Sequence, residues 1–403
     1  GGLMQLVAYG AQDVYLTGNP QITFFKVVYR RHTNFAMESV EQTFNGQADF
    51  GKRVTATIGR NGDLISRIYL QVTLPSVDGS SVSSAFFRWV NYVGLFLIKA
   101  VEVEIGGQRI DKQYGDWLNI WNELTQEAGH QAGYDNMVGN TIALTGTGLH
   151  GTEATTLYVP LQFWFCRNPG LSLPLIALQY HEVKINLDFR PKNECYVSTG
   201  SSMGGCGGSH GNLDLFCVPS LEAASLYVDY IYLDTDERRR FAQVSHEYLI
   251  EQVQHTGVET KGSITMNFNH PVKALFWNAD ALTTNDDIKL QLNGHDRFSA
   301  QKHDYFHLVQ PYECGLGHGK VLNTNNRQWQ DVGATTDHKN VGMYSFCLKP
   351  AEHQPSGTCN FSRIDNAKLN LGTLASGKKV WLFAMNYNVL RIMSGMGGLA
   401  YSN

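Results

Sequence analysis

The chain has 403 residues, 43% of them hydrophobic and only 17% charged, so it is long enough for two or three domains and too apolar to be disordered. Its formal net charge of −4 at pH 7 supplies no strong positive field, which argues against direct binding of nucleic acid. The longest apolar run, near residues 92–98, is too short to cross a bilayer, so no membrane insertion is expected. With 40 glycines, 19 tyrosines and 20 phenylalanines, the composition favours strands joined by tight turns.

Residues 1–25 show no sustained hydrophobic period. We expect them to form an N-terminal arm whose tail lies on a neighbouring subunit. Beyond the arm, runs of β-branched and aromatic residues alternate with turn residues, which is typical of strands. The first half holds about eight strand candidates, the clearest at residues 38–44, 54–58, 64–74, 101–105, 157–165, 176–189 and 225–233. Residues 129–151, rich in Gly and Thr, are expected to form a loop.

The clearest local signal is the segment at residues 101–117, VEVEIGGQRIDKQYGDW. Apolar residues alternate there with Glu102 and Glu104, the pattern of a strand with one buried face. Gly106-Gly107 then supplies two residues that readily adopt positive φ, as a type I′ hairpin turn requires. After the hairpin, Asp116 is predicted to cap a helix with one apolar face, formed by Trp117, Leu118, Trp121 and Leu124.

The same arrangement returns in the second half, at residues 288–305. Apolar and polar residues alternate up to Asn293-Gly294, a strong hairpin signal. Both stretches then reach an Asp-aromatic pair, Asp116-Trp117 in the first and Asp304-Tyr305 in the second. Weaker matches keep the same order: residues 40–42 with 250–252, 54–58 with 264–268, 183–187 with 367–371, and 227–233 with 381–387. The constant order predicts a duplicated unit whose second copy has shorter loops.

The charged run at residues 234–242, DTDERRRFA, is the best candidate for a domain boundary and is expected to be a surface linker. We therefore expect an arm at 1–25, a first domain at 26–237 and a second at 238–403 that includes a C-terminal tail. About eight strands per half without βαβ alternation predict an all-β fold of two tandem eight-stranded jelly-roll β-sandwiches, with short helices in the loops. Three such chains would present six similar sandwiches, a shape that can tile a hexagonal sheet.

Seven segments, spread from end to end, resemble one known family. They are QLVAYGAQDVYLTGNPQITFFK (5–26), GRNGDLI (59–65), EIGGQRIDK (104–112), LPLIALQYHEVK (173–184), RFAQVSHEYLIEQ (240–252), QPSGTCNFSRIDNA (354–367) and NYNVLRIMSGMGGLAY (386–401). These segments are similar to the double jelly-roll major capsid proteins of nucleocytoplasmic large DNA viruses. The resemblance is strongest to the algal-virus and mimivirus-like members.

This resemblance implies a homotrimeric capsomer of pseudo-hexagonal outline that tiles an icosahedral shell in the virion. It also implies assembly in the host cytoplasm, with minor capsid or cement proteins as partners besides the chain itself. The connections at residues 279–288 and 372–380 are brief where large outward loops are expected in the family. A tower, glycan or fibre attachment at those loops is therefore not expected.

Glycine-rich stretches at residues 204–208 (GGCGG) and 395–398 (GMGG) are candidates for phosphate-binding loops. Neither is followed by Lys-Ser or Lys-Thr, and neither lies between a predicted strand and helix, as that mechanism requires. We interpret the first as a flexible loop and the second as a C-terminal turn. No cofactor-binding residue is predicted.

The spacing of Cys and His residues gives little support for a metal site. Four candidate ligands share one Gly/Ser-rich loop without the close Cys-x-x-Cys pair that zinc favours: Cys195, Cys206, His210 and Cys217. Solvated thiols are the preferred interpretation, with a metal site or a redox bridge as alternatives. His303 and His307 lie four residues apart, but no third ligand is evident, so structural roles are expected and no metal site is predicted.

No catalytic motif is present, since His246-Glu247 lacks the second His of HExxH and no G-x-S-x-G occurs. The chain is therefore predicted to have no catalytic residue and not to be an enzyme. Asn360 begins the N-x-S/T acceptor Asn360-Phe361-Ser362 and is a candidate for glycosylation, although a chain assembled in the cytoplasm would not meet the secretory machinery. The tryptophans are predicted to be core residues except Trp329: Trp89, Trp117, Trp121, Trp164, Trp277 and Trp381.

The sequence favours a structural viral capsid protein that acts by assembly. A β-sandwich carbohydrate-binding attachment protein is the alternative. It would present a shallow cleft with exposed Trp or Tyr side chains.

Overall fold

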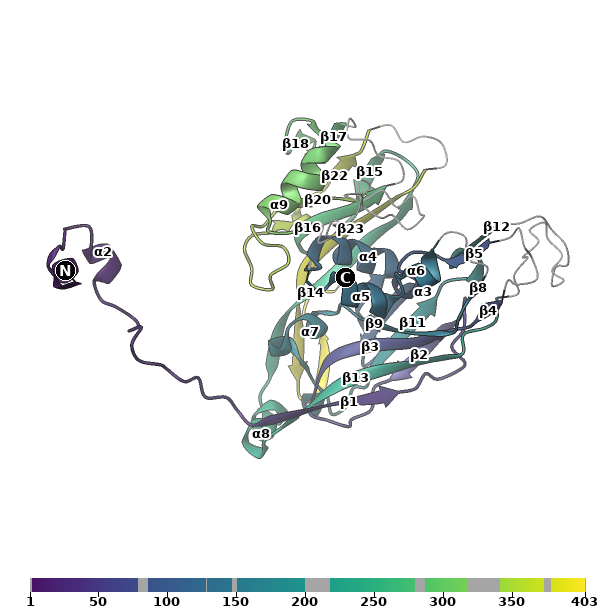
Figure 1. Ribbon diagram of the computed structural model, residues 1–403, viewed down its shortest axis with the longest axis horizontal. Helices are drawn as coiled ribbons and strands as arrows, with labels where there is room; N and C mark the ends of the chain where they lie inside the picture. The colour runs from purple at the N-terminus through teal and green to yellow at the C-terminus, as the bar shows by residue number, and fades with distance from the viewer. Residues whose placement is uncertain are drawn as a thin grey trace. The chain divides into compact units, whose positions relative to one another are not determined.

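The computed structural model describes residues 2–78, 86–127, 129–146, 151–199, 218–279, 287–317, 341–372 and 378–402. The chain separates into two compact units, residues 1–35 and residues 36–403. In the first unit, α1 (Gly2–Val7) and α2 (Val14–Thr17) are short helices without buried residues, and residues 18–34 form no helix or strand. The second unit holds both β-sandwiches (Figure 1).

The first sandwich is built from two sheets. One contains β1 (Phe35–Gln42), β13 (Ala223–Leu233), β3 (Leu64–Leu74) and β10 (Leu173–Pro174) in that order, and β9 (Thr155–Pro160) also pairs with β3. The other contains β2 (Arg53–Thr57), β11 (Val183–Phe189), β6 (Ile98–Ile105) and β7 (Gln108–Tyr114). The strand pairs of both sheets are antiparallel wherever their register is defined, as a sandwich of this kind requires.

The second sandwich repeats this plan. One sheet contains β14 (His246–Glu259), β23 (Val380–Met393), β16 (Pro271–Ala279) and β20 (Val341–Ser345), with β21 (Cys359–Asn360) on β16 and β24 (Met396–Leu399) on β23. The other contains β15 (Ser263–Met266), β22 (Ala367–Asn370), β17 (Asp287–Leu292) and β18 (His295–Asp296), with β19 (Gln301–Lys302) on β17.

The two sandwiches share one strand order. The order β2-β11-β6-β7 recurs as β15-β22-β17-β18, and β1-β13-β3 recurs as β14-β23-β16. β9 and β10 pair with the two ends of β3 as β20 and β21 pair with the two ends of β16. The predicted all-β fold of two tandem jelly rolls is confirmed, and the segments matched in sequence occupy equivalent strands.

Both predicted hairpin turns are confirmed. Gly106 and Gly107 have φ of 57° and 84° between β6 and β7, and Asn293 and Gly294 have φ of 51° and 80° between β17 and β18. Positive φ at both central residues is the geometry of a type I′ turn, which suits the twist of the flanking strands.

Short elements fill the loops. The helices are α3 (Val93–Leu97), α4 (Gly115–Thr125), α5 (Gln131–Val138), α6 (Ile142–Thr145), α7 (Trp164–Arg167), α8 (Thr235–Gln243) and α9 (Gln310–Glu313), with the π-helical turn η4 (Tyr305–Val309). The 3₁₀ turns are η1 (Pro169–Leu171), η2 (Leu175–Ala177), η3 (Lys192–Glu194) and η6 (Phe361–Arg363). Two further strand pairs are β4 (Val77–Asp78) with β8 (Gly151–Thr152), and β5 (Phe86–Trp89) with β12 (Tyr196–Thr199).

Three local predictions are wrong. The loop predicted at 129–151 contains α5 and α6, which Val138 and Leu144 anchor in the core, although too few apolar residues recur at helical spacing to reveal them. The strand predicted at 157–165 ends at Pro160 and is followed by α7, and the strand predicted at 176–189 begins only at Val183. In contrast, the segment predicted as a surface linker at 234–242 forms helix α8, which has no buried residue and whose N-cap Asp234 accepts a hydrogen bond from the Thr235 amide at 2.8 Å.

The helix predicted after the first hairpin is confirmed as α4, and its four apolar side chains are buried. Its N-cap is Tyr114, so the prediction that Asp116 caps it is wrong. Asp116 lies in the first turn, where a carboxylate favours the helix dipole, and accepts a hydrogen bond from the Arg190 guanidinium at 2.7 Å.

The apolar interior forms two clusters that meet at β16. The larger cluster fills the first sandwich and continues to Phe276 and Phe383 of the second. The smaller cluster lies inside the second sandwich and includes Trp277 and Leu382. Neighbouring residues of β16 thus belong to different clusters, so this strand is buried on both faces. Among the described residues, no helix is long and apolar enough to span a bilayer.

The junction between the jelly rolls and the candidate sites

An aromatic contact joins the two jelly rolls. Helix α4 of the first lies against β16 and β23 of the second (Figure 1). The ring of Trp117 lies 5.1 Å from that of Phe276 and 5.8 Å from that of Phe383, measured between centroids. Trp121 packs on the same Phe276 at 6.4 Å. Because these large side chains are buried together, the contact resembles a protein core more than a hinge.

A buried charge cluster crosses the same junction. Glu251 on β14 accepts hydrogen bonds from Lys273 of β16 and forms an ion pair with Arg167 of α7, both at 2.5 Å. Lys273 also donates to the Glu352 carbonyl at 2.7 Å and lies 4.9 Å from the centre of the Tyr387 ring. Burial lowers the pKa of Lys273, and the Glu251 carboxylate opposes that shift. Since Arg167 comes from the first jelly roll, the cluster fixes one jelly roll against the other.

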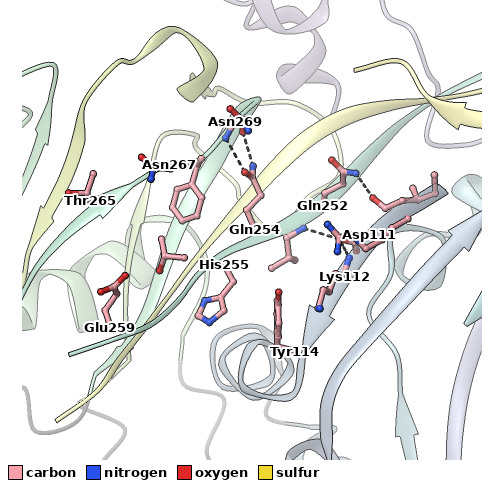
Figure 2. A pocket seen from close by; sticks show the side chains of 15 residues that line it. Asp111, Lys112, Tyr114, Gln252, Gln254, His255, Glu259, Thr265, Asn267 and Asn269 are labelled. Atoms are coloured by element: carbon pink, nitrogen blue, oxygen red, sulfur yellow. Dashed lines mark hydrogen bonds between the residues drawn. The ribbon is translucent and has the colours of Figure 1, made fainter. Parts of the chain in front are cut away.

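A polar groove lies beside this junction, between β7 of the first jelly roll and β14 and β15 of the second (Figure 2). It encloses about 440 Å³. Its lining is rich in amides and charged groups, including Lys112, Gln254, His255, Glu259 and Asn267. Gln254 and the backbone of Asn269 exchange two hydrogen bonds, at 2.7 and 3.0 Å.

The buried carboxylate of Asp111 links strands β7 and β14 in this groove. Its carboxylate accepts hydrogen bonds from the amides of Lys112 and Val253, at 2.9 and 3.1 Å, and from the Gln113 side chain at 3.0 Å. Burial raises the pKa of Asp111 to about 6 despite these donors. Beside it, the Gln252 side chain donates to the Ile110 carbonyl. The hydrogen bonds of Asp111 to the Val253 amide and of Gln252 to the Ile110 carbonyl therefore hold β7 against β14.

The aromatic rings of the groove also pack on one another. The Tyr114 ring meets the His255 ring edge to face at 5.0 Å, and His255 stacks on Phe383 at 4.4 Å. Burial lowers the pKa of His255. The described part of this groove brings together no Ser or Cys nucleophile with a base.

Of the four candidate ligands in the Gly/Ser-rich loop, the structure describes only Cys195. Cys195 is fully buried and burial raises its pKa to about 12, so the interpretation of Cys195 as a solvated thiol is wrong. Cys206, His210 and Cys217 lie outside the described residues. His303 and His307 are both buried, with ring centroids 5.9 Å apart, and His307 contacts the Val341 carbonyl at 2.9 Å. In the described part of the chain, no three His, Cys, Asp or Glu side chains cluster as metal ligands would.

The remaining candidates are placed as follows. Asn360 is exposed, and its side chain accepts a hydrogen bond from the Ser362 amide at 3.0 Å. Trp381 is half-buried, and Trp329 lies outside the described residues. The other tryptophans are buried: Trp89, Trp117, Trp121, Trp164 and Trp277.

The charge cluster was not predicted, although one signal could have found it. Lys273 is the single charged residue of β16, PVKALFWNA, which is otherwise nearly all apolar. A lysine in the middle of such a strand must be buried, and a buried cation needs a carboxylate partner. The identity of that partner depends on strand pairing, which a single sequence does not reveal.

Comparison with known proteins agrees with this architecture. The profile described as "Major capsid protein N-terminus" matches residues 23–234, and that described as "Large eukaryotic DNA virus major capsid protein" matches residues 237–288 and 325–398. The chain is 59% identical, over 421 residues and the whole length of both proteins, to the "Major capsid protein" of Pyramimonas orientalis virus. The chain belongs to the major capsid proteins of large eukaryotic DNA viruses.

Other members of this capsid protein family agree with that placement. The "Major capsid protein" of Paramecium bursaria Chlorella virus 1 is 42% identical over 477 residues, covering all of both chains. A chain of the solved "PBCV-1 virus capsid, quasi-atomic model" has a TM-score of 0.73 and 37% identity, covering 94% of this chain and 100% of that one. The "Faustovirus major capsid protein" has a TM-score of 0.72 at 13% identity, covering 97% of this chain and 96% of that one, which shows a shared fold.

The predicted resemblance to capsid proteins of large DNA viruses is therefore confirmed. Members of this family are structural components of the virion capsid. The chain is a structural protein of that kind and not an enzyme.

Proposed function

We propose that three copies of this chain form a pseudo-hexagonal capsomer and that these capsomers tile an icosahedral shell. The repeated strand order carries this proposal, because two similar jelly rolls per chain give six similar bodies per trimer. The fixed junction supports it as well, since a rigid pair holds one angle between its jelly rolls. The boundaries that suit this role are an arm at 1–25, a first jelly roll at 26–237 and a second at 238–403.

The arm is our candidate for contacts with neighbouring subunits. Its large apolar side chains are exposed within one chain, among them Leu3, Leu6, Leu16, Phe24 and Phe25. A soluble surface rarely keeps so many large apolar groups in water, so burial against another subunit is the expected outcome of assembly. Minor capsid or cement proteins would bind the assembled shell, and assembly would take place in the host cytoplasm. In that compartment Asn360 would stay unmodified.

Light scattering on the purified protein tests the proposal at micromolar concentration. We expect a mass three times that of the 45.0 kDa chain. The interface should bury well over about 2,000 Å², as in obligate oligomers. A monomer at all concentrations would contradict the proposal, and a monomer that binds glycans on an array would support the carbohydrate-binding alternative.

A further inference from the structure

The outer face of one sheet in the second jelly roll is covered within the chain. Phe383, Phe276 and Met343 lie side by side on β23, β16 and β20, and all three are fully buried. Trp117 and Trp121 of α4 cover this row. The contact that joins the two jelly rolls is therefore a helix of the first on a sheet face of the second.

The equivalent sheet face of the first jelly roll is open. Tyr227, Tyr69 and Pro160 form the corresponding row on β13, β3 and β9, and Tyr158 lies beside it, opposite Gln71. Tyr158 is 46% exposed, whereas the alternate residues of these strands are buried in the core. We call this surface the tyrosine face, and it consists of Tyr69, Gln71, Thr73, Thr156, Tyr158, Pro160 and Tyr227.

The composition of the tyrosine face is that of an interface. None of its residues is charged, and charged residues begin at its border, with Arg67 on β3 and Asp229 on β13. The wet face of an antiparallel sheet is ordinarily polar, and charged side chains are common there. Protein interfaces, in contrast, are enriched in tyrosine and depleted of charge at their centres.

The second jelly roll carries the counterpart of α4. The turns η4 and α9 follow the second hairpin as α4 follows the first, and Asp304-Tyr305 corresponds to Asp116-Trp117. In this alignment three buried positions of α4 correspond to residues that are at least 40% exposed. They are Ile120 with Leu308, Trp121 with Val309 and Leu124 with Tyr312.

The exposed residues of this counterpart are large and apolar. Leu308 is 54% exposed and Tyr312 is 84% exposed. We call Leu308, Val309 and Tyr312 the η4–α9 ridge. Among the described residues, the first jelly roll thus has an open sheet face without a covering helix, and the second has an exposed helical ridge without a sheet to cover.

We propose that the η4–α9 ridge of one copy packs on the tyrosine face of a second copy, as α4 packs on the Phe276 row within each chain. The partner is a second copy because duplication leaves both halves of this contact on every chain. A head-to-tail contact closes into a ring when the same rotation relates each copy to the next. Around a trimer, three contacts within chains would then alternate with three contacts between chains. This inference rests on the proposed trimer and adds the surfaces that form it.

Two substitutions test the inference, one on each surface. Tyr158→Glu places a charge on the tyrosine face, and Leu308→Glu places one on the ridge. Each should raise the protein concentration needed for trimers more than about 100-fold, because a carboxylate buried without a partner is strongly disfavoured. Met396→Glu is the matched control, since Met396 is 51% exposed on another hairpin and lies on neither surface. Light scattering should show trimers for the control and monomers for the two test variants.

Mixing the two variants gives a sharper readout. A Tyr158→Glu chain keeps its ridge and a Leu308→Glu chain keeps its tyrosine face, so a mixture can form one intact contact. We expect heterodimers in the mixture, detected by light scattering and by cross-linking, and no closed trimers. Thr156→Glu and Tyr312→Glu are second variants of each surface, used if either first variant loses its circular dichroism spectrum.

The outcomes separate the two proposals. Trimers of folded Tyr158→Glu or Leu308→Glu at wild-type concentrations would overturn this interface and leave the trimer standing. Absence of heterodimers from the mixture would overturn the head-to-tail arrangement. A monomeric wild-type chain would overturn the proposed function itself.

Discussion

The central strands β3 and β16 occupy the same place in the two jelly rolls, yet they are buried differently. In β3, buried residues from Ile68 onward alternate with half-exposed ones, whereas β16 is buried without interruption from Val272 to Trp277. Their sequences differ in the same way, since LISRIYLQVTL alternates and PVKALFWNA is nearly all apolar. A period-2 pattern therefore marks a sheet with one open face, and its loss marks a sheet covered on both.

The largest expected effect comes from breaking the buried charge cluster of Glu251, Lys273 and Arg167 at the junction between the jelly rolls. Glu251→Ala leaves Lys273 and Arg167 without their carboxylate, and removing one partner of a buried ion pair typically costs about 3–5 kcal/mol. We expect a loss of this size in the free energy of unfolding, measured with urea at a fixed protein concentration.

A pair on the same strand provides the control for Glu251. Glu247 pairs with Arg391 at 2.8 Å, and both side chains are more than half exposed. Exposed ion pairs contribute between about 0 and 1 kcal/mol, so Glu247→Ala should change stability little. Equal effects of the two substitutions would show that the buried cluster does not hold the junction.

The second prediction compares the two sheet faces directly. Phe276→Ala removes a fully buried ring between the jelly rolls and should cost about 3–5 kcal/mol of unfolding free energy. Tyr158→Ala acts on the open face and should cost less than about 1 kcal/mol. Urea unfolding of the monomeric Leu308→Glu chain measures both without the contribution of assembly. A larger loss from Tyr158→Ala would reverse the assignment of covered and open faces.

The third prediction concerns pH at the junction. The pKa of Asp111 is raised to about 6 from its ordinary value of 3.8, so folding favours its protonated form. Its contribution to stability is therefore full below about pH 4 and is lost as pH rises through about 6, a change of about 2–3 kcal/mol.

Asp111→Asn isolates this contribution, because the amide has no titrating proton. The difference in unfolding free energy between wild type and variant should vary between pH 4 and pH 7, with the wild type losing stability relative to the variant. A difference that stays constant across this range would show that Asp111 titrates normally.

The smallest expected effect compares the two hairpins. A Cβ at Gly106 would lie 2.4 Å from the His181 ring, at a φ of +57°, whereas Gly294 has open space at a φ of +80°. Gly106→Ala should therefore cost more than the roughly 1–2 kcal/mol of left-handed strain alone, and Gly294→Ala no more than that strain. Thermal unfolding of the two variants makes the comparison. Equal melting temperatures would indicate that His181 moves aside freely.

The same contrast explains why one turn uses Gly and the other Asn. Asn293 has no such neighbour and gains contacts, because its side chain accepts hydrogen bonds from the amides of Asp365 and Asn366 at 2.9 and 3.2 Å. Asparagine tolerates positive φ better than other residues with a side chain. Each turn residue is thus selected by its local surroundings.

Local features of the fold could be predicted from the sequence, and distant ones could not. The hairpins at Gly106 and Asn293 and the apolar face of α4 are set by residues close in the chain. Helices α5 and α6 were missed because their anchors Val138 and Leu144 are too sparse to show a helical period. The burial of Cys195 depends on packing between strands, which the surrounding Gly/Ser-rich sequence concealed.

Electron microscopy of the purified protein tests most directly the claim that one jelly roll was duplicated and that three pairs complete a ring. We predict flat particles with a three-fold axis and six similar lobes, two from each chain. Particles with only three lobes, or elongated dimers, would contradict the account.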